Sequence, residues 1–105
     1  MRNAALRSTV FAVLLALTIS VGLTACEQSS VRGQVIEVRA GDIIEWDSIV
    51  VRGGDGRDYE FSRGPEIDLR LWRASHLREH MTLGLPITVE YEAVDGVLIA
   101  TALAD

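Results

Sequence analysis

The chain has 105 residues, enough for one domain, and its composition is strongly acidic. Fifteen aspartates and glutamates stand against ten arginines and no lysine, which gives a formal net charge of −5 at pH 7. Nucleic-acid phosphates and anionic lipid headgroups are bound by clustered cations, so this composition argues against a nucleic-acid-binding protein and against a domain that lies flat on anionic lipid.

The first 25 residues have the layout of a secretory signal peptide. Arg2 and Arg7 give a short positive region, and an uncharged apolar stretch follows up to Cys26. A stable membrane span takes about 20 apolar residues, so this stretch would be marginal as one. We expect residues 1–25 to direct export and then to be removed.

The end of this segment resembles a bacterial lipobox, formed by Leu23, Thr24, Ala25 and Cys26. Small residues before the cysteine suit cleavage by the lipoprotein signal peptidase, and the thiol accepts a diacylglyceryl group as a thioether. The sequence therefore predicts a lipoprotein that begins at Cys26 and carries covalent diacylglycerol, with an N-acyl chain such as palmitate, and no other cofactor. Two or more acyl chains anchor a protein durably.

Lipidation at Cys26 predicts an extracytoplasmic location, on the cell membrane or the outer membrane. The only thiol would be consumed by lipid, which leaves none for an intrachain disulfide. Loss of Arg2 and Arg7 would change the net charge to −7. Residues 26–30 form a short tether that keeps the domain within roughly 20 Å of the bilayer. We expect its partner to be a neighbouring membrane or envelope protein, or a small soluble ligand.

Three β-strands are expected in the first half of the domain, which spans residues 31–105. Apolar and polar residues alternate in each, as they do in half-buried strands, although the alternation slips at residues 47–48, where a bulge could fall. Gly-Gly-Asp-Gly at 53–56 indicates a hairpin turn, and Tyr59 and Phe61 then share one strand face. The expected strand bounds are 31–40, 43–52 and 57–62.

A short helix follows the third strand. Residues 64–74 read as an extended segment that carries Trp72 to the core. Ser75 suits the N-cap of a helix over about residues 76–82, which ends near Gly84. Two further strands, 86–94 and 97–104, flank an Asp-Gly turn.

Three strands, a helix and a two-stranded hairpin occur in the order of a five-stranded OB barrel, with its helix between strands three and four. The sequence thus predicts a mainly β, OB-like barrel preceded by a lipoprotein signal peptide. An SH3-like barrel and an open α+β sandwich are the alternatives.

Part of the chain resembles a group of small bacterial lipoproteins and membrane-tethered proteins without an established activity. The resemblance rests on Ser-His-Leu-Arg-Glu-His-Met at 75–81 and Gly-Leu-Pro-Ile-Thr-Val-Glu-Tyr at 84–91, and more loosely on the Gly-Gln-Val-Ile-Glu-Val strand. This group usually has a proline before the first string, where this chain has Ala74. The resemblance implies a compact β-barrel outside the membrane, and no catalytic role can be carried over from it.

Residues 76–80 read His-Leu-Arg-Glu-His, which matches the inverted zinc-peptidase signature. A peptidase of that kind needs a third ligand on a separate helix downstream. The residues after His80 read as a β-hairpin, so we do not expect a peptidase. A non-catalytic metal site is the second interpretation, with His76 and His80 one turn apart and a carboxylate from Glu79, or from Glu90 or Glu92 on the next strand.

The remaining interpretation is structural. Leu77 and Met81 would face the barrel, while His76 and His80 flank them and bind backbone or acidic neighbours. His76, Arg78 and His80 could also form a recognition patch.

Aromatic side chains offer another candidate surface. Tyr59, Phe61 and Trp46 could form a stacking platform for a saccharide, as OB barrels often do, although filling a small core is the simpler interpretation. No nucleophile–base pair is evident in the sequence. We therefore expect a non-enzymatic, lipid-anchored binding or accessory protein, with a metal-binding lipoprotein and a saccharide-binding barrel as alternatives.

Overall fold

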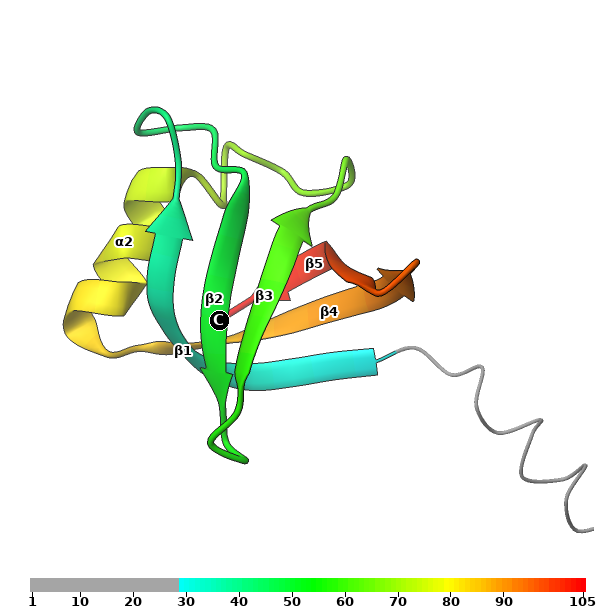
Figure 1. Cartoon of the computed structure of the whole chain (residues 1–105). Coiled ribbons are helices and arrows are strands. Elements are labelled where there is room, and N and C mark those ends of the chain that lie inside the picture. The colour runs from blue at the N-terminus through cyan, green and yellow to red at the C-terminus, as the bar shows by residue number, and fades with distance from the viewer. Residues whose placement is uncertain (1–28) are drawn as a thin grey trace, which may run out of the picture.

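A computed structural model describes residues 29–105, which fold into a closed barrel with one helix (Figure 1). The signal peptide and the lipobox residues Leu23, Thr24, Ala25 and Cys26 lie outside the described residues. Within the described part, no helix is long and apolar enough to cross a membrane. The elements are β1 Ser29–Arg39, β2 Ser48–Gly53, β3 Asp58–Arg63, α2 Ala74–Leu83, β4 Pro86–Val94 and β5 Val97–Ala104.

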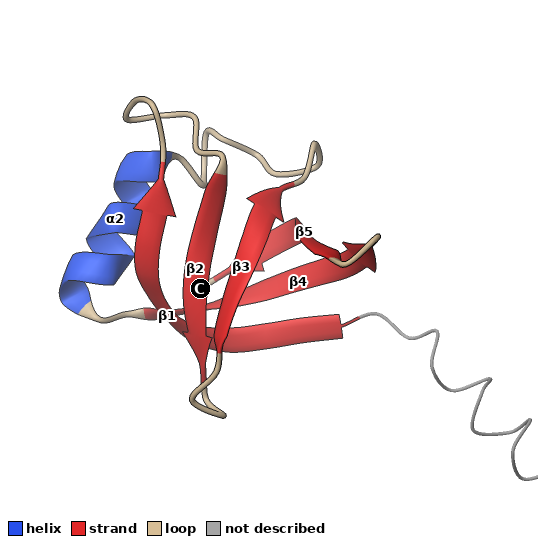
Figure 2. Ribbon diagram, in the orientation of Figure 1, coloured by secondary structure: helices blue, strands red, loops and turns tan. Residues whose placement is uncertain are grey.

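The strands close in the order β1-β2-β3-β5-β4, with every pair antiparallel except β3 and β5 (Figure 2). This arrangement, with the helix between β3 and β4, is the predicted OB-like barrel. Closure depends on the bend of β1, whose first half pairs with β4 and whose second half pairs with β2. Gly33 lies at the changeover, where a Cβ atom would come within 2.0 Å of the Arg52 carbonyl oxygen. Only glycine allows this close approach.

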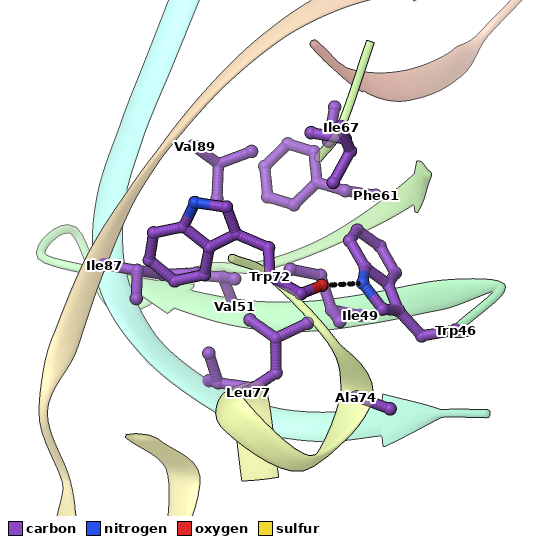
Figure 3. Packing of buried hydrophobic residues seen from close by; sticks show 12 residues of the cluster. Trp46, Ile49, Val51, Phe61, Ile67, Trp72, Ala74, Leu77, Ile87 and Val89 are labelled. Atoms are coloured by element: carbon purple, nitrogen blue, oxygen red, sulfur yellow. Dashed lines mark hydrogen bonds between the residues drawn. The ribbon is translucent and has the colours of Figure 1, made fainter. Parts of the chain in front are cut away.

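The core fills the barrel and extends beneath α2 (Figure 3). Trp46 and Phe61 are fully buried, and Trp72 reaches the same cluster, as predicted. The segment that carries Trp72 is not extended as predicted, because hydrogen bonds from Ile67 to Gly64 and from Leu71 and Trp72 to Asp68 fold it into turns. The Trp46 Nε1–H donates to the Trp72 carbonyl at 2.8 Å, which ties the loop before β2 to the segment before α2. Tryptophan thus fills volume here while its one polar atom is satisfied.

The second strand begins later than predicted. Residues 43–47 form a loop, and β2 starts at Ser48. The Asp42 carboxylate accepts hydrogen bonds from the backbone N–H groups of Ile44 and Glu45, at 2.8 and 2.7 Å, which turns the chain away from a sheet ladder. The apolar side chains of Ile43 and Ile44 mimic a strand pattern, yet they are exposed.

The start of the helix also differs from the prediction. α2 begins at Ala74, and Arg73 at the N-cap position makes no side-chain capping bond. The N–H groups of Ala74 and Ser75 instead donate to the carbonyls of Ile44 and Ile43, at 2.9 and 3.0 Å. Because the loop satisfies these unpaired helix donors, Ser75 is not needed as a cap.

Candidate functional site

The helix α2 brings the two histidines of the chain together. His76 and His80 lie four residues apart on one face, with ring centroids 4.8 Å apart. Trp72 stacks against His76, with 4.9 Å between centroids and 13° between ring planes, and it also contacts His80 at 5.9 Å. The indole therefore forms an apolar wall on one side of the imidazole pair.

Two backbone carbonyls determine which ring nitrogens carry hydrogen. His76 Nδ1 lies 2.6 Å from the Leu71 carbonyl oxygen, and His80 Nδ1 lies 3.3 Å from that of Leu85. A carbonyl oxygen only accepts, so both Nδ1 atoms must donate. In a neutral imidazole, the other nitrogen, Nε2, then presents a lone pair.

These two Nε2 atoms face each other and a carboxylate. They are 3.1 Å apart, and His80 Nε2 is 3.0 Å from Asp105 Oδ1. One ligand atom from each of His76, His80 and Asp105 lies within 4.8 Å of the others. The contacts of His80 Nε2 with His76 Nε2 and Asp105 can be satisfied by a proton on one of the imidazoles or by a metal ion bound to all three groups.

The chemistry of this group suits a divalent transition metal. Zn²⁺ binds imidazole nitrogen and carboxylate oxygen at about 2.0–2.2 Å, so tetrahedral ligand atoms lie about 3.3 Å from one another. The distances from His80 Nε2 to His76 Nε2, 3.1 Å, and to Asp105 Oδ1, 3.0 Å, are close to that ligand–ligand distance. Imidazole favours Zn²⁺, Cu²⁺ or Ni²⁺ over Mg²⁺ and Ca²⁺.

The site combines a rigid buried half with an exposed half. His80 is only 7% exposed, whereas the Asp105 side chain is 73% exposed. The Nδ1–H to carbonyl bonds hold the imidazoles in place, as they do for many metal-bound histidines. Because Asp105 is exposed, this side of the group is open to solvent.

Asp105 was not among the predicted ligands. It follows β5 directly, and the β4–β5 register places Ala104 opposite Thr88, close to the end of α2. Counting back along the predicted hairpin from its Asp-Gly turn would have placed residue 105 beside the start of β4. The observed ladder shifts its register by one residue between Glu90 and Tyr91, so this count differs from the observed pairing by one residue.

The carboxylates predicted from the sequence are not part of this group. Glu79 is exposed on α2, and neither Glu90 nor Glu92 is among the ligand atoms that the structure brings together. Arg78 is partly buried on the same helix and forms no ion pair with a described carboxylate. The string His-x-x-Glu-His therefore supplies two histidines here, and its glutamate lies outside the cluster.

The predicted aromatic platform is not formed. Trp46 and Phe61 are fully buried, so neither offers a face to a saccharide. Tyr59 is partly buried, and its hydroxyl donates to Asp55 Oδ2 at 2.6 Å. That bond is the main reason why the pKa of Asp55 lies below its ordinary value. These aromatic residues fill the core and brace the β2–β3 turn.

No family model, curated protein or solved structure matches this chain. The resemblance to small bacterial lipoproteins therefore stays a prediction. The geometry of the histidine site is the remaining guide to function.

Proposed function

We propose that this protein is a non-enzymatic, lipid-anchored metal-binding module on the extracytoplasmic face of a bacterial membrane. The observation that carries the metal site is the convergence of His76 Nε2, His80 Nε2 and Asp105 Oδ1 while both Nδ1 atoms are committed to backbone carbonyls. The anchor is supported by the lipobox at residues 23–26.

Three protein ligands leave at least one coordination position for water or for a donor from another molecule. An open, partly exposed site suits reversible capture or transfer of an ion more than a closed structural role. The proposed cargo is Zn²⁺ or a neighbouring divalent transition metal, held at a membrane surface.

Thermal unfolding of residues 27–105 with and without Zn²⁺ tests this function, because the barrel and its core form entirely within residues 29–105. A ligand that binds only the folded state stabilises it by about 2.7 kcal/mol at 100 times its Kd. For a domain of this size, that is a rise in Tm of roughly 10 °C or more.

The shift in Tm should disappear in His76→Ala and in His80→Ala, each compared with its own metal-free Tm. Glu79→Gln is the matched control, since Glu79 is exposed on the same helix and lies outside the cluster. An unchanged Tm for the parent domain in excess Zn²⁺ would mean that a proton, and not a metal, joins the three groups.

A second candidate role, as the accessory subunit of a neighbouring envelope protein, is supported by three exposed apolar residues whose backbones lie around the start of α2. Ile43, Ile44 and Leu71 are exposed large apolar residues. The carbonyls of Ile43 and Ile44 accept hydrogen bonds from the N–H groups at the start of α2. The Leu71 carbonyl accepts one from His76 Nδ1. Isolated exposed apolar residues are ordinary, whereas a group of them suits a protein contact.

Crosslinking of the lipidated protein in its native membrane tests this role. Ile43→Asp with Ile44→Asp should remove a specific crosslinked partner, while Leu83→Asp, exposed at the other end of α2, should retain it. An identical crosslinking pattern in both variants would contradict the accessory role.

A further inference from the structure

The two ends of the barrel differ in their distance from the proposed lipid anchor. In Figure 1, β1 begins beside the end of β4, while α2 lies at the opposite end. The register agrees, since Ser29 pairs with Tyr91, and Gln34 pairs with Pro86. The first described residue therefore enters the barrel at the end that carries the β4–β5 turn.

The β4–β5 turn extends past this point of entry. Three residues of β4, Glu92 to Val94, continue beyond Tyr91, and the strands then reverse through Asp95 and Gly96. Both turn residues have positive φ, 51° and 79°, as the tight two-residue hairpin requires. At about 3.4 Å per residue, the turn projects roughly 10 Å past Tyr91.

Cys26 is three residues before Ser29, so covalent geometry limits their separation to about 11 Å. The projecting turn and the lipid-bearing residue are thus confined to the same end of the molecule. If acyl chains at Cys26 lie in the bilayer, the tether keeps the end of the barrel at Ser29 within about 11 Å of the lipid-bearing residue, and the turn projects from that same end.

Two exposed valines flank the turn at the tip of this hairpin. Val94 and Val97 form a cross-strand pair, and they are 45% and 47% exposed. Glu92 and Asp95 are exposed beside them, which disfavours an anionic lipid surface. A bilayer interface rich in zwitterionic headgroups fits this combination.

We propose that the tip of the β4–β5 hairpin, Val94 to Val97, is a bilayer-contact element that seats the barrel upright beside its own lipid anchor. This inference rests on the lipid anchor of the proposed function. Its consequence is an orientation: β4 runs from the contact to Pro86, about 26 Å away at 3.3 Å per residue. His80 and Asp105 lie at that far end, so the metal site faces away from the membrane.

The test uses the full chain, produced in a lipidating bacterium and placed in phosphatidylcholine–phosphatidylethanolamine vesicles. Because acylation consumes the only native thiol, a cysteine introduced by Val94→Cys can be labelled alone with a nitrobenzoxadiazole fluorophore. Leu83→Cys is the matched control, since Leu83 is 62% exposed at the end of α2. Nitroxide-labelled lipids should quench the label at position 94 several-fold more than the label at position 83.

Two other results would overturn the inference in distinguishable ways. Equal quenching at both positions, in protein that floats with the vesicles, would overturn the bilayer contact and leave the anchor intact. A mass spectrum showing unmodified Cys26, in protein that does not float, would overturn the anchor and the contact together. Labelling at Val97→Cys repeats the test on the partner strand.

Discussion

His76 and His80 point their Nε2 atoms at each other across 3.1 Å because backbone carbonyls hold both Nδ1 atoms. Two lone pairs at that distance repel one another unless a cation lies between them. The Asp105 carboxylate, 3.0 Å from His80, adds negative charge at the same point. This relationship is the main reason for assigning metal binding to a helix that otherwise looks structural.

Replacing Asp105 tests whether the third ligand contributes. Asp105→Asn removes the charge and retains one oxygen, so we expect Zn²⁺ affinity to fall about tenfold or more, equivalent to about 1.4 kcal/mol. Isothermal titration calorimetry measures the change. Asp95→Asn, in the distant β4–β5 turn, is the control and should bind Zn²⁺ as the parent does. Equal Zn²⁺ affinity in the parent, Asp105→Asn and Asp95→Asn would mean that Asp105 is not a metal ligand.

The glycine that ends α2 also shapes the site. Gly84 has φ 66°, and the reversal there lets the Leu85 N–H donate to the His80 carbonyl at 3.0 Å while the Leu85 carbonyl accepts from His80 Nδ1. Gly84→Ala should destabilise the domain by about 1–2 kcal/mol because an L-residue is strained in this conformation. Urea denaturation measures this loss, and a change below about 0.5 kcal/mol would count as a surface effect and contradict the prediction.

Two leucines on α2 allow a matched test of its packing. Leu77 is fully buried under the helix, and Leu83 is exposed at its end. Leu77→Ala should cost about 2–5 kcal/mol through lost burial and a new cavity. Leu83→Ala should change stability by less than about 0.5 kcal/mol. Similar losses in both variants, measured by chemical denaturation, would mean that α2 does not pack on the barrel as described.

Tyr59 and Asp55 provide a test of electrostatics away from the site. The Tyr59 hydroxyl is the largest cause of the lowered pKa of Asp55, followed by the Arg57 N–H. Tyr59→Phe should raise the Asp55 pKa toward its ordinary value, as followed by carboxyl ¹³C chemical shifts. Because the folded-state pKa is depressed, this bond stabilises the fold above the unfolded pKa, and its contribution is lost as pH falls through the folded pKa. An unchanged Asp55 titration would contradict the bond.

Most of the fold could be predicted from the sequence. Strand alternation and two glycine-containing turns were sufficient for the five strands, and the position of the helix in their order indicated an OB-like barrel. The exception was the segment around Ile43 and Ile44, where local apolar residues looked like a strand. The Asp42 carboxylate accepts from the N–H groups of Ile44 and Glu45, and the Ile43 and Ile44 carbonyls accept from the start of α2, so this segment forms a loop.

The site could be predicted only in part. Helical spacing was enough to pair His76 with His80, and it also predicted that they would bind backbone and acidic neighbours. The structure brings Asp105 to the two histidines, and none of the predicted glutamates, because β5 pairs along the whole of the β4–β5 hairpin and ends beside the start of β4. Stacking of Trp72 on His76 likewise depends on how the 64–74 segment folds over the helix.

The most direct test of the metal site is the imidazole ¹⁵N spectrum of residues 27–105 during titration with Zn²⁺. If the proposed site binds Zn²⁺, the Nε2 resonances of His76 and His80 move together and saturate at one equivalent of Zn²⁺, while both Nδ1 atoms stay protonated. Coordination through Nδ1, or a spectrum unchanged by excess Zn²⁺, would contradict the proposed site.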